Sequence, residues 1–305
     1  MRIAVIGAGA MGGMFGARFA DAGAEVVLVD RDAEHVRAIA TDGLAVERED
    51  GQHWHRLLAV TDPTGLAPAD LVLVMVDCNA TGEAAAVAGG LLAPDGAALT
   101  LQNGIGNVEA LVEVLGEARV MAGSTMNSAA RTGPGRVAHT HLGKTVLGEP
   151  DGSRTERLEE VAKLFEAAGL PVAVTDNVMG HIWQKFVLNA ALNPVSAITR
   201  LRPGEIADSP AARDLVNAIL DEVLAVVAAE GISLPDLDAR ESILGHAVGR
   251  MNKPSMLQHV EQGRRTEIDA LNGALLAYAA RHGIACPVNA TIVQLVKAIE
   301  GRGAG

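Results

Sequence analysis

Residues 2–12 of this chain, RIAVIGAGAMG, decide the fold of its N-terminal half. The β-branched run at residues 2–6 predicts a buried strand. Gly7, Gly9 and Gly12 follow it in a Gly-x-Gly-x-x-Gly pattern. In this pattern the first glycine permits a tight turn, the second lets the backbone approach a pyrophosphate, and the third lets the next helix pack closely on the strand. The following residues decide between a dinucleotide site and a glycine-rich turn without a ligand.

A helix and a second strand continue the pattern. The sequence predicts a helix to about Gly23 and a strand at residues 25–29, which ends at Asp30, 18 positions after Gly12. The free N–H groups at the start of such a helix bind anions. We therefore predict a dinucleotide-binding turn made of Gly7, Ala8, Gly9, Ala10, Met11 and Gly12.

The end of the second strand bears on which dinucleotide binds. Asp30 could accept both ribose hydroxyls of NAD, and its charge would disfavour a 2′-phosphate. Arg31, the next residue, could pair with that phosphate in NADP. These two residues leave both cofactors open.

Further buried strands follow in the N-terminal half. Residues 71–76 and 97–101 are apolar runs that alternate with Ala-rich helical stretches, as parallel strands do. The predicted fold class is therefore α/β, with a Rossmann-type doubly wound parallel sheet. Asn103 follows the second run at the edge where open sheets bind ligands, so it is a candidate site residue unless it caps the next helix. Other predicted elements are strands at residues 118–125, 136–140, 144–148 and 171–175 and a helix at 155–168.

Two histidines on one predicted strand, His139 and His141, raise the question of a metal. Residues two apart on a strand point to the same face, but no third ligand is evident nearby. Cys78 and Cys286 have no Cys or His at metal-ligand spacing, which suits a reducing compartment. We predict no metal site and assign the histidines structural or cleft-lining roles.

The pattern after Asn177 is helical. We expect Pro194 to kink or stop the first helix. The chain is therefore predicted to form a dinucleotide-binding Rossmann domain at residues 1–176 and an all-helical substrate and catalytic domain at 177–305. Gly and Pro separate helices predicted at residues 182–193, 210–230, 238–250, 266–282 and 288–300.

The first of these helices carries a polar stripe. Lys185, Asn189 and Asn193 are four residues apart and share one face of an otherwise apolar helix. A lone ammonium removed from water is unfavourable unless something pairs with it. The stripe is therefore expected to face a polar cleft or a carboxylate, and Glu267 is the candidate partner. The alternative is a partly exposed helix with a solvated lysine.

Composition excludes several classes of partner. Hydrophobic residues make up 49% of the 305 residues and charged residues 20%, as in an ordinary soluble protein. The net charge of −12 would repel nucleic acid and anionic lipid, and aromatics at 2% leave few side chains for base stacking. The first residues do not show the basic stretch, apolar stretch and cleavage site of a signal peptide, and the sequence contains no run of eighteen apolar residues. We expect a cytoplasmic protein with a small-molecule partner, and neither nucleic acid nor membrane.

Several stretches of the chain resemble the ketopantoate reductase (2-dehydropantoate 2-reductase) family. The likeness runs from the first strand to about Lys297, and the Ser-Met and Thr-Glu-Ile-Asp pieces are specific to the family. The matching stretches are the glycine turn at residues 7–12, Leu101-Gln102-Asn103-Gly104, Lys185 with Asn189 and Asn193, and Lys253-Pro254-Ser255-Met256 followed by Arg265-Thr266-Glu267-Ile268-Asp269.

The resemblance implies a Rossmann domain followed by a helical domain, with the active site in the cleft between them. It implies an NAD(P)-dependent oxidoreductase that reduces ketopantoate to pantoate in pantothenate biosynthesis, with Lys185 as general acid and Glu267 as a second essential polar group. Such an acid suits the reaction, because a proton must reach the alkoxide that forms as hydride adds to carbon. Arg31 matches the position that contacts the 2′-phosphate, which implies NADPH. The residues implied to line the substrate pocket are Asn103, Asn189, Asn193, Asn252 and Ser255.

Two positions depart from the family pattern. Asp77 stands where family members usually carry Lys, and Asp30 stands beside Arg31. Together they keep open the use of NADH and a relative that reduces other bulky 2-oxo acids to D-2-hydroxy acids. A dinucleotide-binding sensor or scaffold is the non-enzyme alternative, which Asp77 favours and the intact Lys185 and Glu267 oppose. The physiological 2-oxo acid and a homodimeric state are left open.

Overall fold

The computed structural model describes residues 1–236 and 238–301, and the chain divides into two compact units. Unit 1 comprises Met1–Gln102 and Asn107–Val178. Unit 2 comprises the short segment Asn103–Gly106 and the chain from Met179 onwards. A segment that interrupts the first unit in sequence therefore belongs to the second unit in space.

An eight-stranded sheet forms the centre of unit 1, in the order β12-β11-β8-β7-β6-β1-β2-β5. Neighbouring strands are parallel except for the antiparallel pair β11 and β8. Because β1 lies between β2 and β6, the glycine turn that follows β1 lies at the switch point of a doubly wound sheet. The strands are β1 (Arg2–Ile6), β2 (Glu25–Val29), β5 (Leu58–Val60), β6 (Ala69–Val74), β7 (Leu92–Thr100), β8 (Val120–Thr125), β11 (Thr145–Gly148) and β12 (Val172–Val174).

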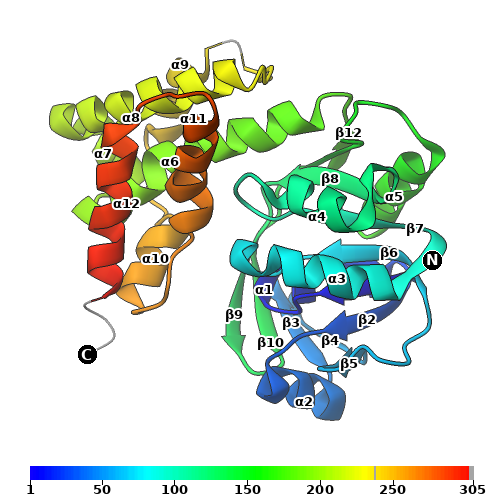
Figure 1. Ribbon diagram of the computed structural model, residues 1–305. Helices are drawn as coiled ribbons and strands as arrows, with labels where there is room; N and C mark the ends of the chain where they lie inside the picture. The colour runs from blue at the N-terminus through cyan, green and yellow to red at the C-terminus, as the bar shows by residue number, and fades with distance from the viewer. Residues whose placement is uncertain (237, 302–305) are drawn as a thin grey trace. The chain divides into compact units, whose positions relative to one another are not determined.

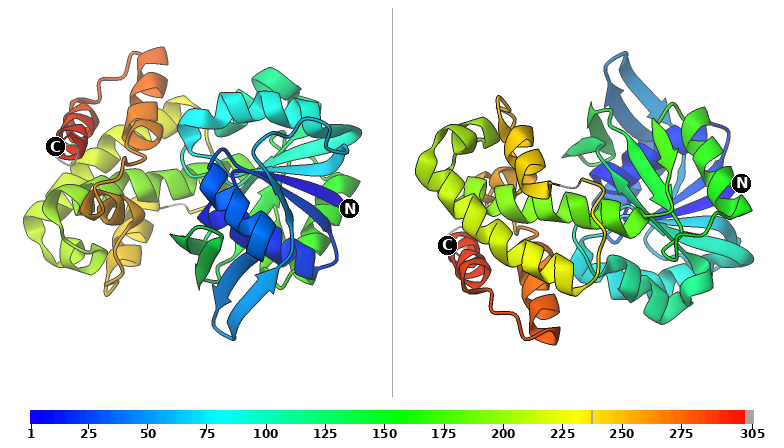
Figure 2. Two further views of the ribbon diagram at one scale, coloured as in Figure 1. Left: turned by 90° about the horizontal axis from the view of Figure 1, so that it is seen from below. Right: turned by 90° about the horizontal axis from the view of Figure 1, so that it is seen from above.

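Helices cover both faces of this sheet, with α3 and α4 on one side and α1 and α5 on the other (Figures 1 and 2). Three of the seven aromatic residues of the chain pack here: Phe19 of α1 packs against Phe165 of α5 with ring centroids 5.1 Å apart, and Phe15 completes the cluster. The helices are α1 (Ala10–Asp21), α2 (Ala33–Asp42), α3 (Thr81–Leu91), α4 (Asn107–Leu115) and α5 (Glu156–Ala167), with short 3-10 turns η1 (Cys78–Ala80) and η2 (Glu117–Arg119).

A second, four-stranded sheet in the order β4-β3-β10-β9 also belongs to unit 1. Its buried residues Leu44, Val46 and Val137 join the same core as Phe15 of α1. Of these strands only β10 could be predicted from the sequence; β4 and β9 are largely exposed and carry few apolar residues. The strands are β3 (Leu44–Arg48), β4 (Gly51–His55), β9 (Ser128–Gly133) and β10 (Arg136–His141).

The described part of unit 2 contains helices and no strand. Trp183 of α6 packs edge-on against Phe186 and Tyr278, with ring centroids 5.4 and 5.3 Å apart, and all three side chains are buried. The predicted fold class, a Rossmann-type sheet followed by a helical region, is confirmed. Its elements are α6 (Val178–Thr199), α7 (Pro203–Asp208), α8 (Pro210–Ala229), α9 (Ala239–Ala247), α10 (Ser255–Glu261), the π-helical turn η3 (Asp269–Gly273), α11 (Ala274–Arg281) and α12 (Pro287–Glu300).

Two helices of unit 2 differ from their predicted course. Pro194 was expected to kink or stop the first helix, and it does not stop it, because α6 continues to Thr199. The Ala190 carbonyl, which proline leaves without a helical donor, accepts a hydrogen bond from Asn272 Nδ2 at 3.0 Å. The predicted helix at residues 266–282 instead begins with the π turn η3, and regular helix follows only from Ala274.

Candidate functional site

The three glycines of the turn between β1 and α1 differ in their surroundings. Gly7 has φ +90°, and a Cβ there would lie 2.8 Å from backbone atoms of Met75 and Val76. A Cβ at Gly12 would lie 1.9 Å from the Gly7 carbonyl oxygen, so helix and turn can approach only without a side chain. A Cβ at Gly9 would meet no heavy atom within 4 Å. Gly9 therefore faces open space at the start of α1, and the turn fits a pyrophosphate there.

A buried histidine holds the peptide between Ala8 and Gly9. His35 of α2 is fully buried, its Nε2 lies 2.9 Å from the Ala8 carbonyl oxygen, and its Nδ1 accepts from the Gly135 N–H at 2.9 Å. Because a backbone N–H only donates, Nε2 carries the ring hydrogen and donates to Ala8. The C=O and N–H of a trans peptide point in opposite directions. Fixing the Ala8 carbonyl therefore directs the Gly9 N–H away from His35 and leaves it available to an anion.

The turn after β2 engages Asp30 and leaves Arg31 exposed. Asp30 Oδ1 accepts from the Asp32 N–H at 2.9 Å. Asp32 caps α2 with one carboxylate oxygen and pairs with Arg131 of β9 at 2.7 Å through the other. One of the two Asp30 oxygens is therefore already used within the turn, whereas the Arg31 guanidinium faces solvent.

Three polar side chains follow one face of α6. Lys185 and Asn189 are half-buried, and Asn193 is 8% exposed. Burial lowers the pKa of the Lys185 ammonium to about 8, and the Glu267 carboxylate acts in the opposite direction. No hydrogen bond of the Asn189 or Asn193 side-chain amide is found within residues 1–236 and 238–301. These amides therefore remain available to a ligand, beside an amine whose pKa burial lowers to about 8.

Asn103 and Glu267 meet in unit 2, although they are distant in sequence. Asn103 Nδ2 donates to Glu267 Oε2 at 3.4 Å. Helix α4 begins only at Asn107, so the Asn103 amide serves Glu267 rather than that helix. Since Glu267 also raises the pKa of Lys185, the carboxylate connects two predicted site residues. An amine, a carboxylate and an amide from three separate segments thus form one cluster.

The segment that carries Glu267 has an unusual backbone. It leads into η3, where the Gly273 N–H donates to the Ile268 carbonyl five residues earlier, at 2.9 Å. A Cβ at Gly104, which has φ +82°, would lie 2.7 Å from the Ala270 carbonyl oxygen. The segment after Asn103 therefore packs tightly on this turn. Single π turns inside helices are frequent at functional sites.

Asn252 and Ser255 are not brought into this cluster by any hydrogen bond in the described chain. Both are exposed. Ser255 is the first residue of α10, and Pro254 occupies the N-cap position of that helix. The roles of Asn252 and Ser255 in substrate binding stay predictions.

Asp77 lies at the start of η1 and is exposed. Its Oδ1 accepts from the backbone N–H and the side-chain amide of Asn79, at 3.0 and 2.7 Å. Nearby, Gln102 Nε2 donates to the Val76 carbonyl at 2.8 Å and to Thr81 Oγ1 at 2.9 Å. The Asp77 carboxylate is thus engaged within its own loop.

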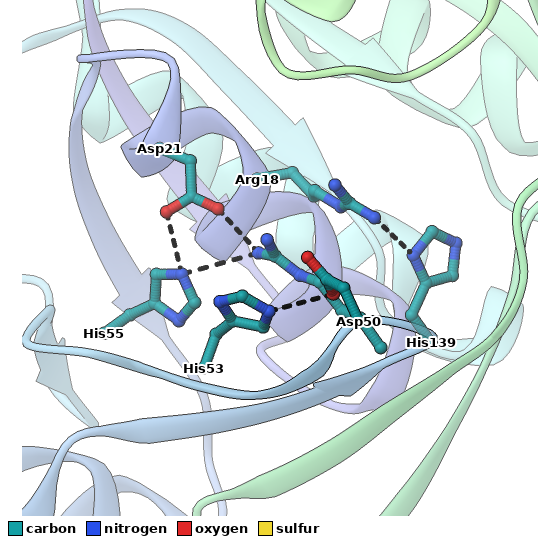
Figure 3. A network of polar contacts seen from close by, with 7 residues as sticks. Arg18, Asp21, Asp50, His53, His55 and His139 are labelled. Carbon is teal, nitrogen blue, oxygen red and sulfur yellow. Dashed lines mark hydrogen bonds and ion pairs between the residues drawn. The ribbon is translucent and has the colours of Figure 1, made fainter.

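A polar network elsewhere in unit 1 accounts for several histidines (Figure 3). Asp21 of α1 accepts from Arg48 Nη2 at 2.7 Å and lies 2.9 Å from His55 Nε2. His139 of β10 is buried, and its Nδ1 lies 3.4 Å from Arg18 Nη2. Burial, followed by the Arg18 charge, lowers the pKa of His139. These groups join the small sheet to α1 and have a structural role.

The two predicted strand histidines differ in environment. The register of β10 shifts between His139 and His141, and His141 is exposed. In the described part of the chain, no group of three or more His, Cys, Asp or Glu residues could hold a metal ion. Likewise, none of the described helices has the length and apolar character needed to cross a membrane.

Sequence reasoning missed two polar residues that organise these sites, His35 and Asn272. His35 belongs to no motif, and its two partners come from the glycine turn and from Gly135. Asn272 interrupts an apolar run, and this interruption is a signal that the sequence alone could have given. The structure shows that the residue is fully buried. Its partner Ala190 is 82 residues away, so only the fold reveals the pairing.

Comparison with known proteins gives matches along nearly the whole chain. The family model for ketopantoate reductase PanE/ApbA matches residues 3–152, and the model for its C-terminal part matches residues 177–300. A 2-dehydropantoate 2-reductase of Halobacterium salinarum is 34% identical over 305 residues, which are 99% of this chain and 100% of that protein.

Two solved structures are similar over the full length of both chains. The PanE/ApbA family ketopantoate reductase from Ralstonia eutropha has a TM-score of 0.90 at 35% identity, with 100% of each chain covered. A D-mandelate dehydrogenase, in a ternary structure with NADH and anilino(oxo)acetate, has a TM-score of 0.91 at 27% identity, again with 100% of each chain covered.

Proposed function

Because this chain belongs to the ketopantoate reductase family, and is hence an NAD(P)-dependent oxidoreductase acting on a 2-oxo acid, we propose that it is a 2-dehydropantoate 2-reductase. In this proposal it reduces ketopantoate to pantoate with NADPH. Residues 1–176 bind the dinucleotide, and residues 177–305 contribute the substrate and catalytic groups. The observation that carries the proposal is the half-buried Lys185, under the influence of Glu267, on a face with available amides.

Lys185 acts as the general acid. The bound nicotinamide supplies the hydride. Lys185 Nζ gives its proton to the carbonyl oxygen as negative charge develops there, and its positive charge stabilises that oxygen beforehand. A pKa of about 8 suits this task, because the amine is largely protonated at neutral pH and yet releases its proton readily. Glu267 keeps the amine protonated and holds the Asn103 amide.

The amides and the hydroxyl predicted for the substrate pocket bind without bringing a competing charge. Asn189 and Asn193 can each donate to the substrate carboxylate and accept from its hydroxyl group. Asn252 and the Ser255 hydroxyl are assigned to the same substrate. Both are exposed and make no hydrogen bond in the described chain that would have to break first.

The turn after β2 supports NADPH. Asp30 could accept from the ribose hydroxyls of either cofactor, since each carboxylate oxygen has two lone pairs and Oδ1 accepts only from the Asp32 N–H. The exposed Arg31 guanidinium is able to form charge-assisted hydrogen bonds to a 2′-phosphate. The cofactor-binding set is the turn from Gly7 to Gly12 together with Asp30, Arg31 and Asn103.

A second candidate is an NAD(P)H-dependent reductase of other bulky 2-oxo acids, forming D-2-hydroxy acids. The full-length similarity to D-mandelate dehydrogenase favours it. Asp77 also favours it, since it stands where the family usually carries Lys. A dinucleotide-binding sensor without turnover is opposed by the cluster of Lys185, Glu267 and Asn103, which a binding protein would not need.

Steady-state assays with the purified full-length protein test the proposal. NADPH and NADH oxidation are each followed with ketopantoate, then with branched and aromatic 2-oxo acids. We expect the highest kcat/KM with NADPH and ketopantoate. A higher kcat/KM with an aromatic acid and NADH would instead support the second candidate. Cofactor binding without oxidation, whatever the acid, would leave only the sensor.

A further inference from the structure

Helix α6 lacks one of its backbone hydrogen-bond donors, because Pro194 lies inside it. In an α-helix, the N–H of residue 194 would donate to the carbonyl of residue 190, but Pro194 has no N–H. A proline inside a helix normally kinks or breaks it. Here α6 continues from Val178 to Thr199, and Asn272 Nδ2 donates to Ala190 O at 3.0 Å. A side chain from another segment thus replaces the donor that the helix lacks.

This hydrogen bond joins the two segments that carry the predicted catalytic groups. Ala190 follows Asn189 directly and lies little more than one helical turn after Lys185. Asn272 lies in η3, which begins two residues after Glu267. The bond therefore ties the helix that bears the acid to the turn that bears its carboxylate.

The orientation of Asn272 is fixed by its surroundings. The residue is fully buried, and its Nδ2 donates to Asn289 Oδ1 at 2.8 Å as well as to Ala190. Asn289 in turn donates to Glu222 Oε2 at 2.7 Å. Asn272 Oδ1 has no partner in the described chain. A flipped amide would place an oxygen against two acceptors, so Asn272 serves purely as a donor.

We infer that Asn272 is a positioning residue for the reduction: by supplying the donor that Pro194 lacks, it holds α6 against η3 and so fixes Lys185 relative to Glu267. This role rests on the proposed function. A buried carbonyl without a donor is unfavourable, so α6 would shift or bend if Asn272 were removed. Displacing a catalytic group by about 1 Å can lower a rate about a hundredfold.

A double-variant experiment in the full-length protein tests the inference. Asn272→Leu removes the donor, and Pro194→Ala restores a backbone N–H to residue 194. We expect Asn272→Leu to lower kcat about tenfold or more, with the NADPH dissociation constant unchanged. The kcat of Pro194→Ala should stay close to that of the wild-type protein. The double variant should recover to within about threefold of Pro194→Ala, since Ala190 then has its helical donor.

The pH profile distinguishes positioning from general loss of packing. Glu267 raises the pKa of Lys185, so moving Glu267 away shifts the basic limb of kcat/KM to lower pH in Asn272→Leu. Glu222→Gln is the matched control. It weakens the bonds that Glu222 accepts from Val288 and Asn289 at the start of α12 but leaves the bond to Ala190 intact. Glu222→Gln should lower the thermal midpoint of unfolding without shifting the basic limb of the kcat/KM profile.

Three results would overturn the role of Asn272. These are a folded Asn272→Leu protein with wild-type kcat and pH profile, a double variant no better than Asn272→Leu, or an equal loss of kcat in Glu222→Gln. If Asn272→Leu does not fold, the double variant decides: activity close to that of Pro194→Ala supports the role, and an inactive double variant contradicts it. A wild-type protein that reduces no 2-oxo acid would instead overturn the proposed function, and this role with it.

Discussion

The glycine turn of unit 1 and the lysine cluster of unit 2 are built by different means. The turn depends on backbone: Gly7 and Gly12 have no room for a Cβ, and Gly9 faces open space. The cluster depends on side chains that come from distant segments, Lys185, Glu267 and Asn103. A backbone site can therefore be identified from local spacing, whereas a side-chain site depends on contacts that only the fold provides.

Replacing Lys185 should separate the two regions most strongly. Lys185→Ala should lower kcat about a thousandfold, because the alkoxide loses its proton donor. The NADPH dissociation constant, measured by fluorescence titration, should stay nearly unchanged, since the turn proposed to bind the cofactor lies in unit 1. Lys163→Ala on the exposed side of α5 is the control and should change neither quantity. Equal losses of kcat and cofactor affinity in Lys185→Ala would contradict the acid role.

Replacing Arg31 should have the next largest effect and act on unit 1 alone. Arg31→Ala should lower kcat/KM for NADPH about thirtyfold and leave kcat/KM for NADH unchanged, because only NADPH carries the phosphate. Arg37→Ala, another exposed arginine close by in sequence, is the control. Should both cofactors lose activity equally, Arg31 does not read the phosphate.

Two alanine substitutions distinguish the part of the turn expected to contact phosphate from the part that packs against the helix. Gly9→Ala should raise the NADPH dissociation constant about tenfold without lowering the thermal midpoint, because its methyl group would enter only the space meant for phosphate. Gly12→Ala should lower the midpoint as well, since its Cβ would lie 1.9 Å from the Gly7 carbonyl oxygen. An unchanged dissociation constant in Gly9→Ala would show that the open space is not the phosphate site.

A change of pH should have the smallest of these effects on kcat/KM near neutral pH. An acid acts only when protonated, so kcat/KM should be retained below pH 8 and fall as the pH rises through about 8, the pKa to which burial lowers Lys185. The loss should reach about tenfold one unit higher. Initial rates across a pH series, with NADPH binding measured in parallel, test this. Activity lost on acidification instead would mean that a base dominates.

Much of unit 1 could be predicted because its signals are local. The turn, β1, β2 and the buried strands β6 and β7 follow from apolar runs and glycine spacing. The second sheet could not, because β4 and β9 are exposed and polar. In the same way, the course of α6 beyond Pro194 depends on Asn272, a residue that sequence patterns do not connect to it.

The candidate cluster was predictable only in part. A stripe of Lys and Asn on an apolar helix required a carboxylate, and Glu267 does act on Lys185. Its geometry depends on the π turn and on Asn103, which no helical periodicity reveals. The catalytic and binding roles of these residues stay predictions until they are measured.

The four-residue segment Asn103–Gly106 limits how the protein can be divided or recombined. A fragment that begins at residue 177 would lack the backbone that covers Ala270 and the amide that reaches Glu267. A chimera that exchanged residues 1–176 for those of another Rossmann protein would introduce a foreign loop beside that carboxylate. Successful grafts should therefore keep this loop with its native helical half.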